Sequence, residues 1–362
     1  MEKLKIAQVA PVMVEIPPQK YGGIESIVTD LTLEMAKRGH AVTVFGAGNS
    51  KIHGTNIEFV ACSPFPTTKD LSQNRKYELA QLELITKRQK EFNLIHFHYE
   101  PLMGRTDSND YQKNLFAQIS TPKIHTFHNT TWIDQNIDYY RRNKEKLDGH
   151  YVFISHDQEK ALQFINHKTV IYNGIHQELY RFNPNPKDFL LFAGRLTKVK
   201  GIEEAIQVSK ITNNKLMIFG KVDSTDLKYF ESQIKPLIDG TQIVYLGEVG
   251  TEKYDYFRDA KALIFPISWH EPFGLVMVEA MASGTPVLAF RSGSVEEVVA
   301  DGKSGFVVST VSEMAEKIDQ LDQVDRYQCR AWVEKNFTVK RMVENYEKLY
   351  LKIANLNNFT YE

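Results

Sequence analysis

Short apolar runs alternate with longer amphipathic stretches along the first half of the chain. Apolar runs of about four to eight residues, bounded by glycine, proline or polar residues, are typical of buried strands. They predict strands at residues 6–10, 41–45, 56–61, 94–98, 123–128 and 152–155. After the first strand, apolar positions three and four residues apart predict a helix, with Ile27, Val28, Leu31 and Met35 on one face. Strands that alternate with helices favour a parallel sheet covered by helices.

The same alternation starts again in the second half, after a segment rich in proline and asparagine at 182–187. The composition of that segment is typical of a domain boundary. Further strands are predicted at 189–193, 215–219, 242–246, 262–265 and 286–290, and helices near 311–321, 326–335 and 338–356. A chain of 362 residues is too long for one ordinary core. We therefore expect two Rossmann-like α/β domains, 1–176 and 177–337, followed by a C-terminal helix in 338–362.

The composition of the chain argues against several classes of function. Hydrophobic residues at 42% and charged residues at 25% are typical of a folded globular protein, and a net charge of −1 gives no basis for a nucleic-acid partner. Cys62 and Cys329 are far apart, which fits a reducing compartment without a disulfide framework. The first residues lack the pattern of a signal peptide, and no apolar run approaches the roughly 20 residues that span a bilayer. We expect a cytoplasmic protein.

The most informative chemistry lies between the strands predicted at 262–265 and 286–290. Glu271 and Glu279 flank a Pro-Phe-Gly turn. Because Pro272 interrupts a helix, we expect Glu271 in the loop and Glu279 inside the helix that follows. The backbone N–H groups that open this helix, those of Phe273, Gly274 and Leu275, favour an anion such as a phosphate.

This stretch resembles the E-x7-E signature of the retaining glycosyltransferases of family 4. Two glutamates separated by seven intervening residues, the Pro-Phe-Gly turn, a Gly-Thr-Pro-Val strand entry and a following Ser-Gly-x-x-Glu carry the resemblance. It implies the GT-B fold, with two Rossmann-like domains whose parallel sheets face a central cleft and a C-terminal helix that crosses back to the first domain. It also implies a UDP- or GDP-sugar as co-substrate, with no other cofactor and no metal.

A second motif follows the strand at 189–193, where Arg195 and Lys200 occur at a strand-to-helix turn after Gly194. The planar fork of arginine and the compact charge of lysine suit a diphosphate. The motif resembles the family's Gly-Arg-Leu…Lys-Gly element. The resemblance further implies that the ends of the next two strands form the nucleobase pocket, and that a Gly-Gly loop in the first domain faces the phosphates or the acceptor. These donor-binding positions are Gly220, Lys221, Glu248, Val249, Gly22 and Gly23.

Four histidines lie near two strand ends of the first half, which raises the hypothesis of a zinc site. Strand periodicity places His96 and His98 on one face, but it places His125 and His128 on opposite faces. No acidic or cysteine ligand completes a set, so we favour no metal. The resemblance implies that His128 reaches the donor sugar and that His96 and His98 are architectural.

Aromatic and basic residues gather between 134 and 148, namely Tyr139, Tyr140, Arg141, Arg142, Lys144 and Lys146. Such a helix forms either an ordinary solvated face or a peripheral contact with an anionic membrane. We favour the solvated face and keep the membrane contact as an alternative.

Together with these features, the resemblance implies a retaining, metal-independent glycosyltransferase that moves a sugar to an acceptor hydroxyl on a sugar, glycan or lipid-linked substrate. The expected pathway is the synthesis of a glycan, polysaccharide or glycolipid. By resemblance, His128, Arg195, Lys200 and Glu271 are the catalytic residues, and Glu279 binds the ribose. Two alternatives share the fold: a nucleotide-sugar epimerase, and a binding protein without catalysis. The epimerase would need acid and base groups around the sugar, and the binding protein would have lost Arg195, Lys200 or Glu271, which are all present.

Overall fold

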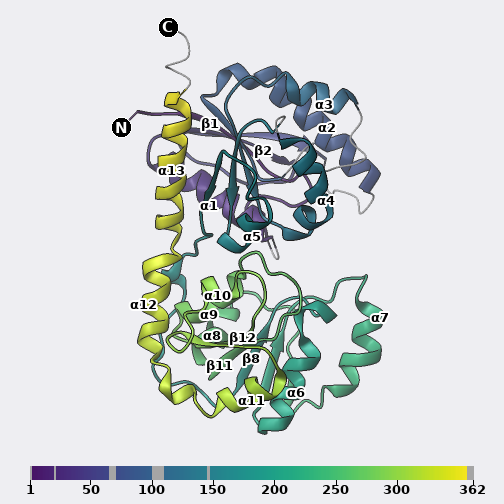
Figure 1. Ribbon diagram of the computed structural model, residues 1–362, viewed down its shortest axis with the longest axis vertical. Helices are drawn as coiled ribbons and strands as arrows, with labels where there is room; N and C mark the ends of the chain where they lie inside the picture. Colours follow the sequence, from purple (N-terminus) through teal and green to yellow (C-terminus); the bar gives the residue numbers. More distant parts are fainter. Residues whose placement is uncertain (1, 20–21, 65–70, 100–109, 145–146, 357–362) are drawn as a thin grey trace. The chain divides into compact units, whose positions relative to one another are not determined.

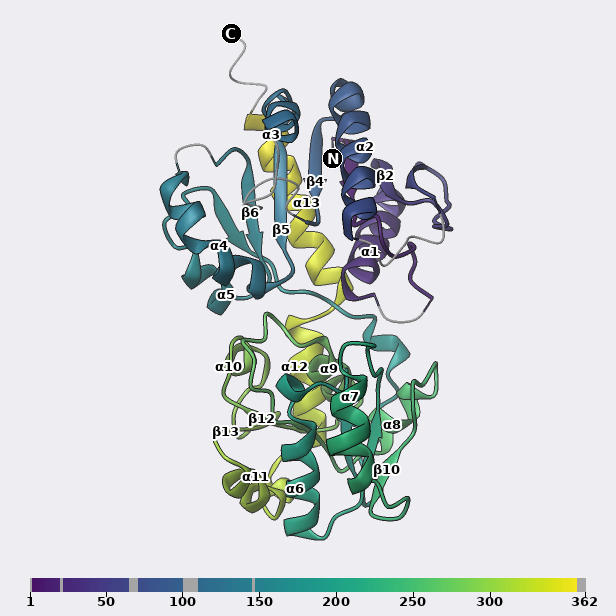
Figure 2. The same ribbon diagram turned by 90° about the vertical axis from the view of Figure 1, so that its right-hand side faces the viewer.

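The computed structural model describes residues 2–19, 22–64, 71–99, 110–144 and 147–356. Tyr21, beside the Gly-Gly loop, and Lys146, in the basic stretch, lie outside these residues. The chain divides into two compact units, one formed by Met1–Tyr172 with Lys340–Glu362 and the other by Asn173–Val339 (Figures 1 and 2). The corresponding sequence-based boundaries were after residues 176 and 337.

The first unit is built on a parallel sheet in the order β3-β2-β1-β4-β5-β6-β7. Its strands are β1 Lys5–Val9, β2 Ala41–Ala47, β3 Ile57–Ser63, β4 Leu94–Phe97, β5 Lys123–Phe127, β6 His150–Phe153 and β7 Lys168–Val170. Its helices are α1 Gly23–Lys37, α2 Leu71–Arg88, α3 Asp110–Ala117, α4 Thr130–Arg142 and α5 His156–Ala161. The strands of this sheet are mostly buried, as a parallel sheet covered by helices requires.

The long helix α13, Val339–Leu356, completes the first unit from the far end of the chain (Figures 1 and 2). Its apolar stripe of Met342, Tyr346 and Leu349 is buried. Glu347 on the same helix accepts a hydrogen bond from Arg38 at 2.6 Å and lies 3.0 Å from His40. The helix is therefore tied to the end of α1 and to the start of β2 by polar contacts as well as by its apolar face.

The second unit repeats the architecture with a parallel sheet in the order β10-β9-β8-β11-β12-β13. Its strands are β8 Leu190–Ala193, β9 Leu216–Phe219, β10 Ile243–Tyr245, β11 Ala262–Phe265, β12 Val287–Phe290 and β13 Gly305–Val308. Its helices are α6 Ile202–Thr212, α7 Leu227–Tyr229, α8 Lys253–Asp259, α9 Leu275–Ala282, α10 Val295–Val298, α11 Val311–Ile318 and α12 Arg326–Asn336. The prediction of two α/β domains with parallel sheets is confirmed.

The strand order determines where each unit can bind a ligand. In both sheets the chain first builds outward on one side of the starting strand and then crosses to its other side, between β1 and β4 and between β8 and β11. Open parallel sheets bind ligands outside the carboxyl ends of the strands at such a reversal. The loops that follow β8 and β11 carry the two strongest sequence motifs, so both motifs meet at the binding edge of the second sheet.

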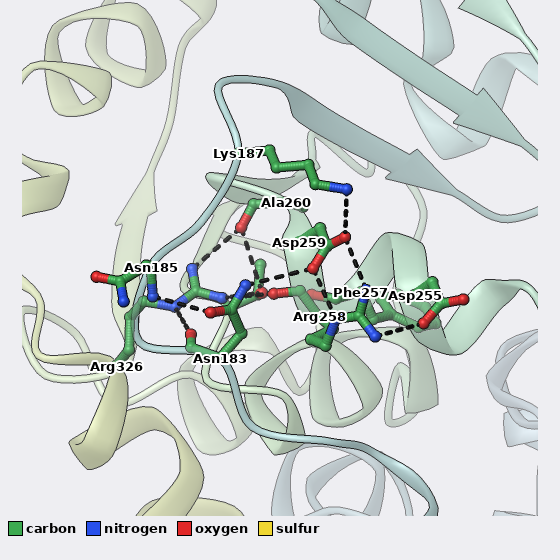
Figure 3. Close-up of polar contacts among 10 residues, drawn as sticks. Asn183, Asn185, Lys187, Asp255, Phe257, Arg258, Asp259, Ala260 and Arg326 are labelled. Carbon is green, nitrogen blue, oxygen red and sulfur yellow. Dashed lines mark hydrogen bonds and ion pairs between the residues drawn. The ribbon is translucent and has the colours of Figure 1, made fainter.

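The proline-rich segment at 182–187 is not a boundary, because it packs onto the second unit (Figure 3). Lys187 Nζ lies 2.8 Å from Asp259 Oδ2, and the buried Arg326 donates to the carbonyl of Asn183 from 2.7 Å. Arg326 also donates to the carbonyl of Ala260 from 3.0 Å. The composition of this segment reflects a surface position on one domain, and the hydrogen bonds hold it there.

Candidate active site

Glycines bring the ends of three neighbouring strands together in the second unit. Gly194 and Gly220 follow β8 and β9, and a Cβ atom on Gly220 would overlap the carbonyl of Gly194. Gly220 in turn donates its N–H to the carbonyl of Gly247, beyond β10, at 2.9 Å. Gly220 adopts φ of 149°, a conformation that side chains rarely take. Glycines at these positions therefore let the loops with Arg195, Lys221, Glu248 and Val249 start from one edge of the sheet.

Arg195 and Lys221 share one carboxylate at this edge. Lys221 Nζ lies 2.8 Å from Asp223 Oδ1, and Arg195 approaches Asp223 Oδ2 at 3.5 Å. The hydrogen bond from Lys221 lowers the pKa of Asp223, and the same bond raises the pKa of Lys221. Two cations and one anion leave a net positive charge. Nε of Arg195 is buried without a hydrogen-bond partner among the described residues. The guanidinium therefore keeps a donor that an anionic ligand could satisfy.

Lys200 and Glu271 meet because two loops pack against each other. Lys200 ends a short 3-10 turn, and the next residue, Gly201, approaches the backbone of Pro266 so closely that a Cβ atom would overlap its carbonyl. Lys200 Nζ lies 2.6 Å from Glu271 Oε2, and both side chains are largely buried. The loop after β8 thus delivers a lysine to the first glutamate of the E-x7-E signature.

Trp269 completes this contact. Its Nε1 donates to Glu271 Oε2 from 2.8 Å, and its ring lies 5.0 Å from Lys200 Nζ. Such a distance is within the range of a cation–π interaction. Both donors use Oε2, and across the described residues no hydrogen bond or ion pair involves Oε1 of Glu271. Within the described residues, Oε1 is therefore the carboxylate oxygen that these two donors leave open. Trp269 was not predicted, since a single tryptophan in a loop carries no sequence signal for this role.

The backbone of Glu271 is held by a hydrogen bond from Ser294 and by close packing against Gly293. The carbonyl of Glu271 accepts the N–H of Ser294 at 2.9 Å. A Cβ atom on Gly293 would lie 2.5 Å from the backbone nitrogen of Glu271 and closer still to its carbonyl oxygen. Gly274 then adopts a left-handed φ of 79° and caps α9, which begins at Leu275. Glu271 lies in the loop and Glu279 inside the helix, as predicted.

The first N–H groups of α9 lie beside Glu271 and lack partners within the helix. This follows from helix geometry for Leu275 and Val276, because an α-helix leaves its first N–H groups without intrahelical acceptors. The partial positive charge of this helix end adds to the charge of nearby cations. Phe273, which we expected to contribute an N–H as well, is buried and packs against Phe337.

Glu279 binds two side chains that sequence reasoning missed. Tyr180 donates to Oε1 from 2.6 Å, and Lys253 Nζ lies 2.8 Å from the same oxygen. Desolvation lowers the pKa of Lys253, but the interaction with Glu279 outweighs it, and the net pKa of this lysine is raised. Lys253 is the first residue of α8, where a cation opposes the helix dipole. That unfavourable placement is the signal that could have identified it.

In the first unit, His128 follows β5 and lies on the same face as His98. His128 Nε2 is 3.2 Å from His98 Nδ1, and the two rings stack at 5.4 Å. His125 lies on the opposite face, where it stacks on Phe97 and Tyr151. The predicted opposition of His125 and His128 is confirmed. Burial lowers the pKa of both rings to about 3.

The Gly-Gly loop leads directly into α1 of the first unit. Gly22 caps the helix, Gly23 is its first residue, and a Cβ atom on Gly22 would lie 2.6 Å from Pro18. Glu25, in the first turn, is 5% exposed, and desolvation raises its pKa to about 7. We did not predict Glu25, because an acidic residue in the first turn of a helix is usually exposed.

Comparison with known proteins identifies the family. A model described as "Glycosyltransferase Family 4" matches residues 21–179, and one described as "Glycosyl transferases group 1" matches residues 178–336. The chain belongs to the family 4 glycosyltransferases. An uncharacterized glycosyltransferase of Methanocaldococcus jannaschii is 28% identical over 227 residues, which are 59% of this chain and 60% of that protein. The chain spans only 60% of the length of that protein and 56% of the length of another relative, an uncharacterized 41.2 kDa protein in the cps region of Klebsiella pneumoniae that is 28% identical over 215 residues.

Solved structures of glycosyltransferases share the fold of this family member. Sucrose-phosphate synthase from Thermosynechococcus elongatus superposes with a TM-score of 0.81 at 18% identity, covering 97% of this chain and 99% of that chain. HepE of Anabaena, solved in complex with UDP and glucose, superposes with a TM-score of 0.69 at 19% identity, covering 96% and 99%. At these identities the likeness establishes the GT-B fold.

Two further features bear on whether the protein contacts a membrane. No helix within the described parts of the chain is long and apolar enough to cross a membrane. On α4, Tyr140 is fully buried and Arg141 forms an ion pair with Asp138 at 3.2 Å. Part of the aromatic and basic stretch therefore belongs to the core, and part is exposed and ion-paired.

Proposed function

We propose that this protein is a retaining glycosyltransferase that transfers a sugar from a UDP- or GDP-sugar to an acceptor hydroxyl. The proposal rests on the residues that gather at the carboxyl ends of the strands in the second sheet. There Arg195, the Lys200–Glu271 pair and the N-terminal end of α9 follow strands β8 and β11, on the two sides of the reversal in strand order. This arrangement suits a diphosphate next to a polyhydroxylated sugar.

The chemical step requires stabilisation of a leaving group. The bond between the anomeric carbon and the diphosphate oxygen breaks with its electron pair, and the acceptor oxygen bonds to the anomeric carbon on the same face. The acceptor's proton passes to the departing diphosphate, so no protein nucleophile is needed. Arg195, Lys200 and the α9 amides would hold the negative charge that develops on the diphosphate. These groups supply positive charge, so we propose a reaction that does not depend on a metal ion.

The two glutamates would bind different parts of the donor, Glu271 the sugar and Glu279 the ribose. Oε1 of Glu271 is available for sugar hydroxyls, while Glu279, held through Oε1 by Tyr180 and Lys253, can offer Oε2 to the ribose. His128 would contact the sugar from the first unit. HepE, which shares this fold, has been solved with UDP and glucose, which supports a nucleotide sugar as donor. The acceptor class we propose is a sugar, glycan or lipid-linked saccharide.

Substitution of Arg195 tests the proposal. With a donor that the wild type turns over, Arg195→Ala should lower kcat at least about tenfold, the scale of losing one donor to a developing oxyanion. Lys235→Ala is the control, because Lys235 is an exposed cation of the same unit paired with Glu231. Equal turnover by Arg195→Ala and the wild type would overturn the assignment. Incubating the donor without acceptor separates the reaction classes, since an epimerase would change the sugar without transferring it.

A further inference from the structure

A continuous hydrogen-bond network is buried beneath His128 in the first unit. It joins side chains of β1, β4, β5 and α13, and each of them is 0–1% exposed. The members are Gln8, His96, His98, Thr126, Tyr346 and Tyr350. A cluster of this size in the core must be fully satisfied to be tolerated, because an unpaired polar group in the interior is costly.

The branch that reaches His128 starts at Gln8. Its amide oxygen lies 2.7 Å from His98 Nε2, and its amide nitrogen donates to the hydroxyl of Tyr350 from 3.1 Å. An amide oxygen only accepts, so Nε2 of His98 must carry the proton. A neutral His98 then presents an unprotonated Nδ1. Burial lowers the pKa of His98 well below its usual value, which keeps the ring neutral.

The same rule determines the proton position on His128. Its Nε2 lies 3.2 Å from the unprotonated Nδ1 of His98, so Nε2 of His128 must be the donor. A neutral His128 therefore has a lone pair on Nδ1. The tautomer of a histidine is commonly set in this way by the partner of its other nitrogen.

We infer that Gln8 and His98 are positioning residues that hold His128 as the Nε2–H tautomer and present its Nδ1 as a hydrogen-bond acceptor for a hydroxyl of the donor sugar. The inference rests on the proposed function for the identity of the ligand. The tautomer itself rests on the network alone. Gln8 and His98 act through His128, and their contribution is the orientation and polarity of its ring.

The other branch serves as an internal control. The Tyr350 hydroxyl lies 2.6 Å from His96 Nδ1, His96 Nε2 lies 2.7 Å from Thr126 Oγ1, and Thr126 contacts the Tyr346 hydroxyl at 3.0 Å. Thr126 is as buried as Gln8, but it is not on the path from Gln8 to His128. Thr126→Val should therefore disturb the same core without changing the His128 ring.

The test reads the tautomer directly by NMR of protein labelled with ¹⁵N-histidine, with the His128 signals assigned through their loss in His128→Gln. The wild type and Thr126→Val should show a protonated Nε2 and an unprotonated Nδ1. In Gln8→Met, which has a similar shape but no amide, the two tautomers should mix, and Gln8→Glu should restore the Nε2–H form because its carboxylate also accepts from His98. A wild-type His128 with its proton on Nδ1 would overturn the inference, since it would mean that Gln8 donates to His98.

Kinetics with a verified donor provide the second readout. Gln8→Met should lower kcat on the order of tenfold, the lower end of the loss seen when an outer partner of a metal-binding histidine is removed, with the donor KM changed less than about threefold. Thr126→Val should keep the wild-type kcat. If His128→Gln turns over normally, the role of His128 in the proposed transfer fails, even where the tautomer is as expected. If Gln8→Met changes the tautomer but not kcat, the positioning role fails while the transferase assignment stands.

Discussion

Lys200 Nζ lies 2.6 Å from Glu271 Oε2, an ion pair between the loops that follow β8 and β11. In the proposed reaction, the pair would bring a positive charge for a phosphate within reach of a carboxylate for a sugar hydroxyl. Trp269 contacts both members, through a hydrogen bond to Glu271 and through its ring face toward Lys200. The geometry of the pair therefore depends on one indole.

The first prediction separates the two contacts of Trp269. Trp269→Phe removes the hydrogen bond to Glu271 but keeps an aromatic ring near Lys200, so kcat/KM for the donor should fall about ten- to a hundredfold, which is the scale of one hydrogen bond to a charged group. Trp269→Leu should lower it further because the cation–π contact is also lost. Trp332→Phe is the control, since Trp332 Nε1 donates to the carbonyl of Val298 and contacts neither residue. Equal kinetics for Trp269→Phe and the wild type would contradict the role of this bond.

The second prediction concerns the contacts of Tyr180 and Lys253 with Glu279. Lys253→Met and Tyr180→Phe each remove one contact to Oε1, so the carboxylate should be less well oriented toward the ribose of the proposed donor. The donor KM should rise roughly tenfold for Lys253→Met and less for Tyr180→Phe, with kcat changed little, as for an interaction made equally in the ground and transition states. Lys235→Met, at the exposed Lys235–Glu231 pair, should leave the donor KM unchanged. A loss of kcat at constant KM would assign Glu279 to the chemical step instead.

The third prediction uses two glycines of similar backbone conformation. Gly293 and Gly302 have φ of 57° and 71°, so alanine is strained at both positions. Only at Gly293 would the new methyl overlap the backbone of Glu271, whereas nothing lies within 4 Å of it at Gly302. Gly302→Ala should cost about 1 kcal/mol, and Gly293→Ala about 1–3 kcal/mol more, with a loss of donor binding. Thermal unfolding and donor titration measure the two effects, and equal behaviour of the two variants would refute the close packing on Glu271.

The fourth prediction is a pH dependence of stability from Glu25. Because desolvation raises the folded-state pKa to about 7, the folded protein keeps this proton between pH 4.5 and 7 while the unfolded chain releases it. Glu25 therefore lowers stability progressively as pH rises through this window. Glu25→Gln should raise the melting temperature at pH 8, by an amount that corresponds to about 1–3 kcal/mol, and should have little effect at pH 5. An equal gain at both pH values would show that the carboxyl is not desolvated.

Sequence reasoning succeeded where the determinant is local. Pro272 and Gly274 determine which glutamate lies in the loop and which in the helix, and strand periodicity separates His125 from His128. It failed where the determinant is a distant partner. Tyr180 reaches Glu279 across 99 residues of sequence, and such a contact follows only from the order of the strands and the packing between them.

The proline-rich segment at 182–187 shows a different kind of failure. Proline and asparagine indicate exposed backbone, and exposure is common to domain boundaries and to surface loops. Asn183 and Lys187 are bound to the second unit through Arg326 and Asp259, and the composition of the segment does not reveal these bonds. The two compact units divide after Tyr172, ten residues before the segment begins.

Because helix α13 belongs to the first unit, it determines when that unit is completed during synthesis. The second unit is one uninterrupted stretch, Asn173–Val339, whereas the first needs residues that are synthesised last. Gln8, at the start of the chain, meets Tyr350 only after that helix has left the ribosome. Domains generally fold as units during synthesis. The second unit is complete in one run of chain, whereas the first is complete only after its last segment has been made.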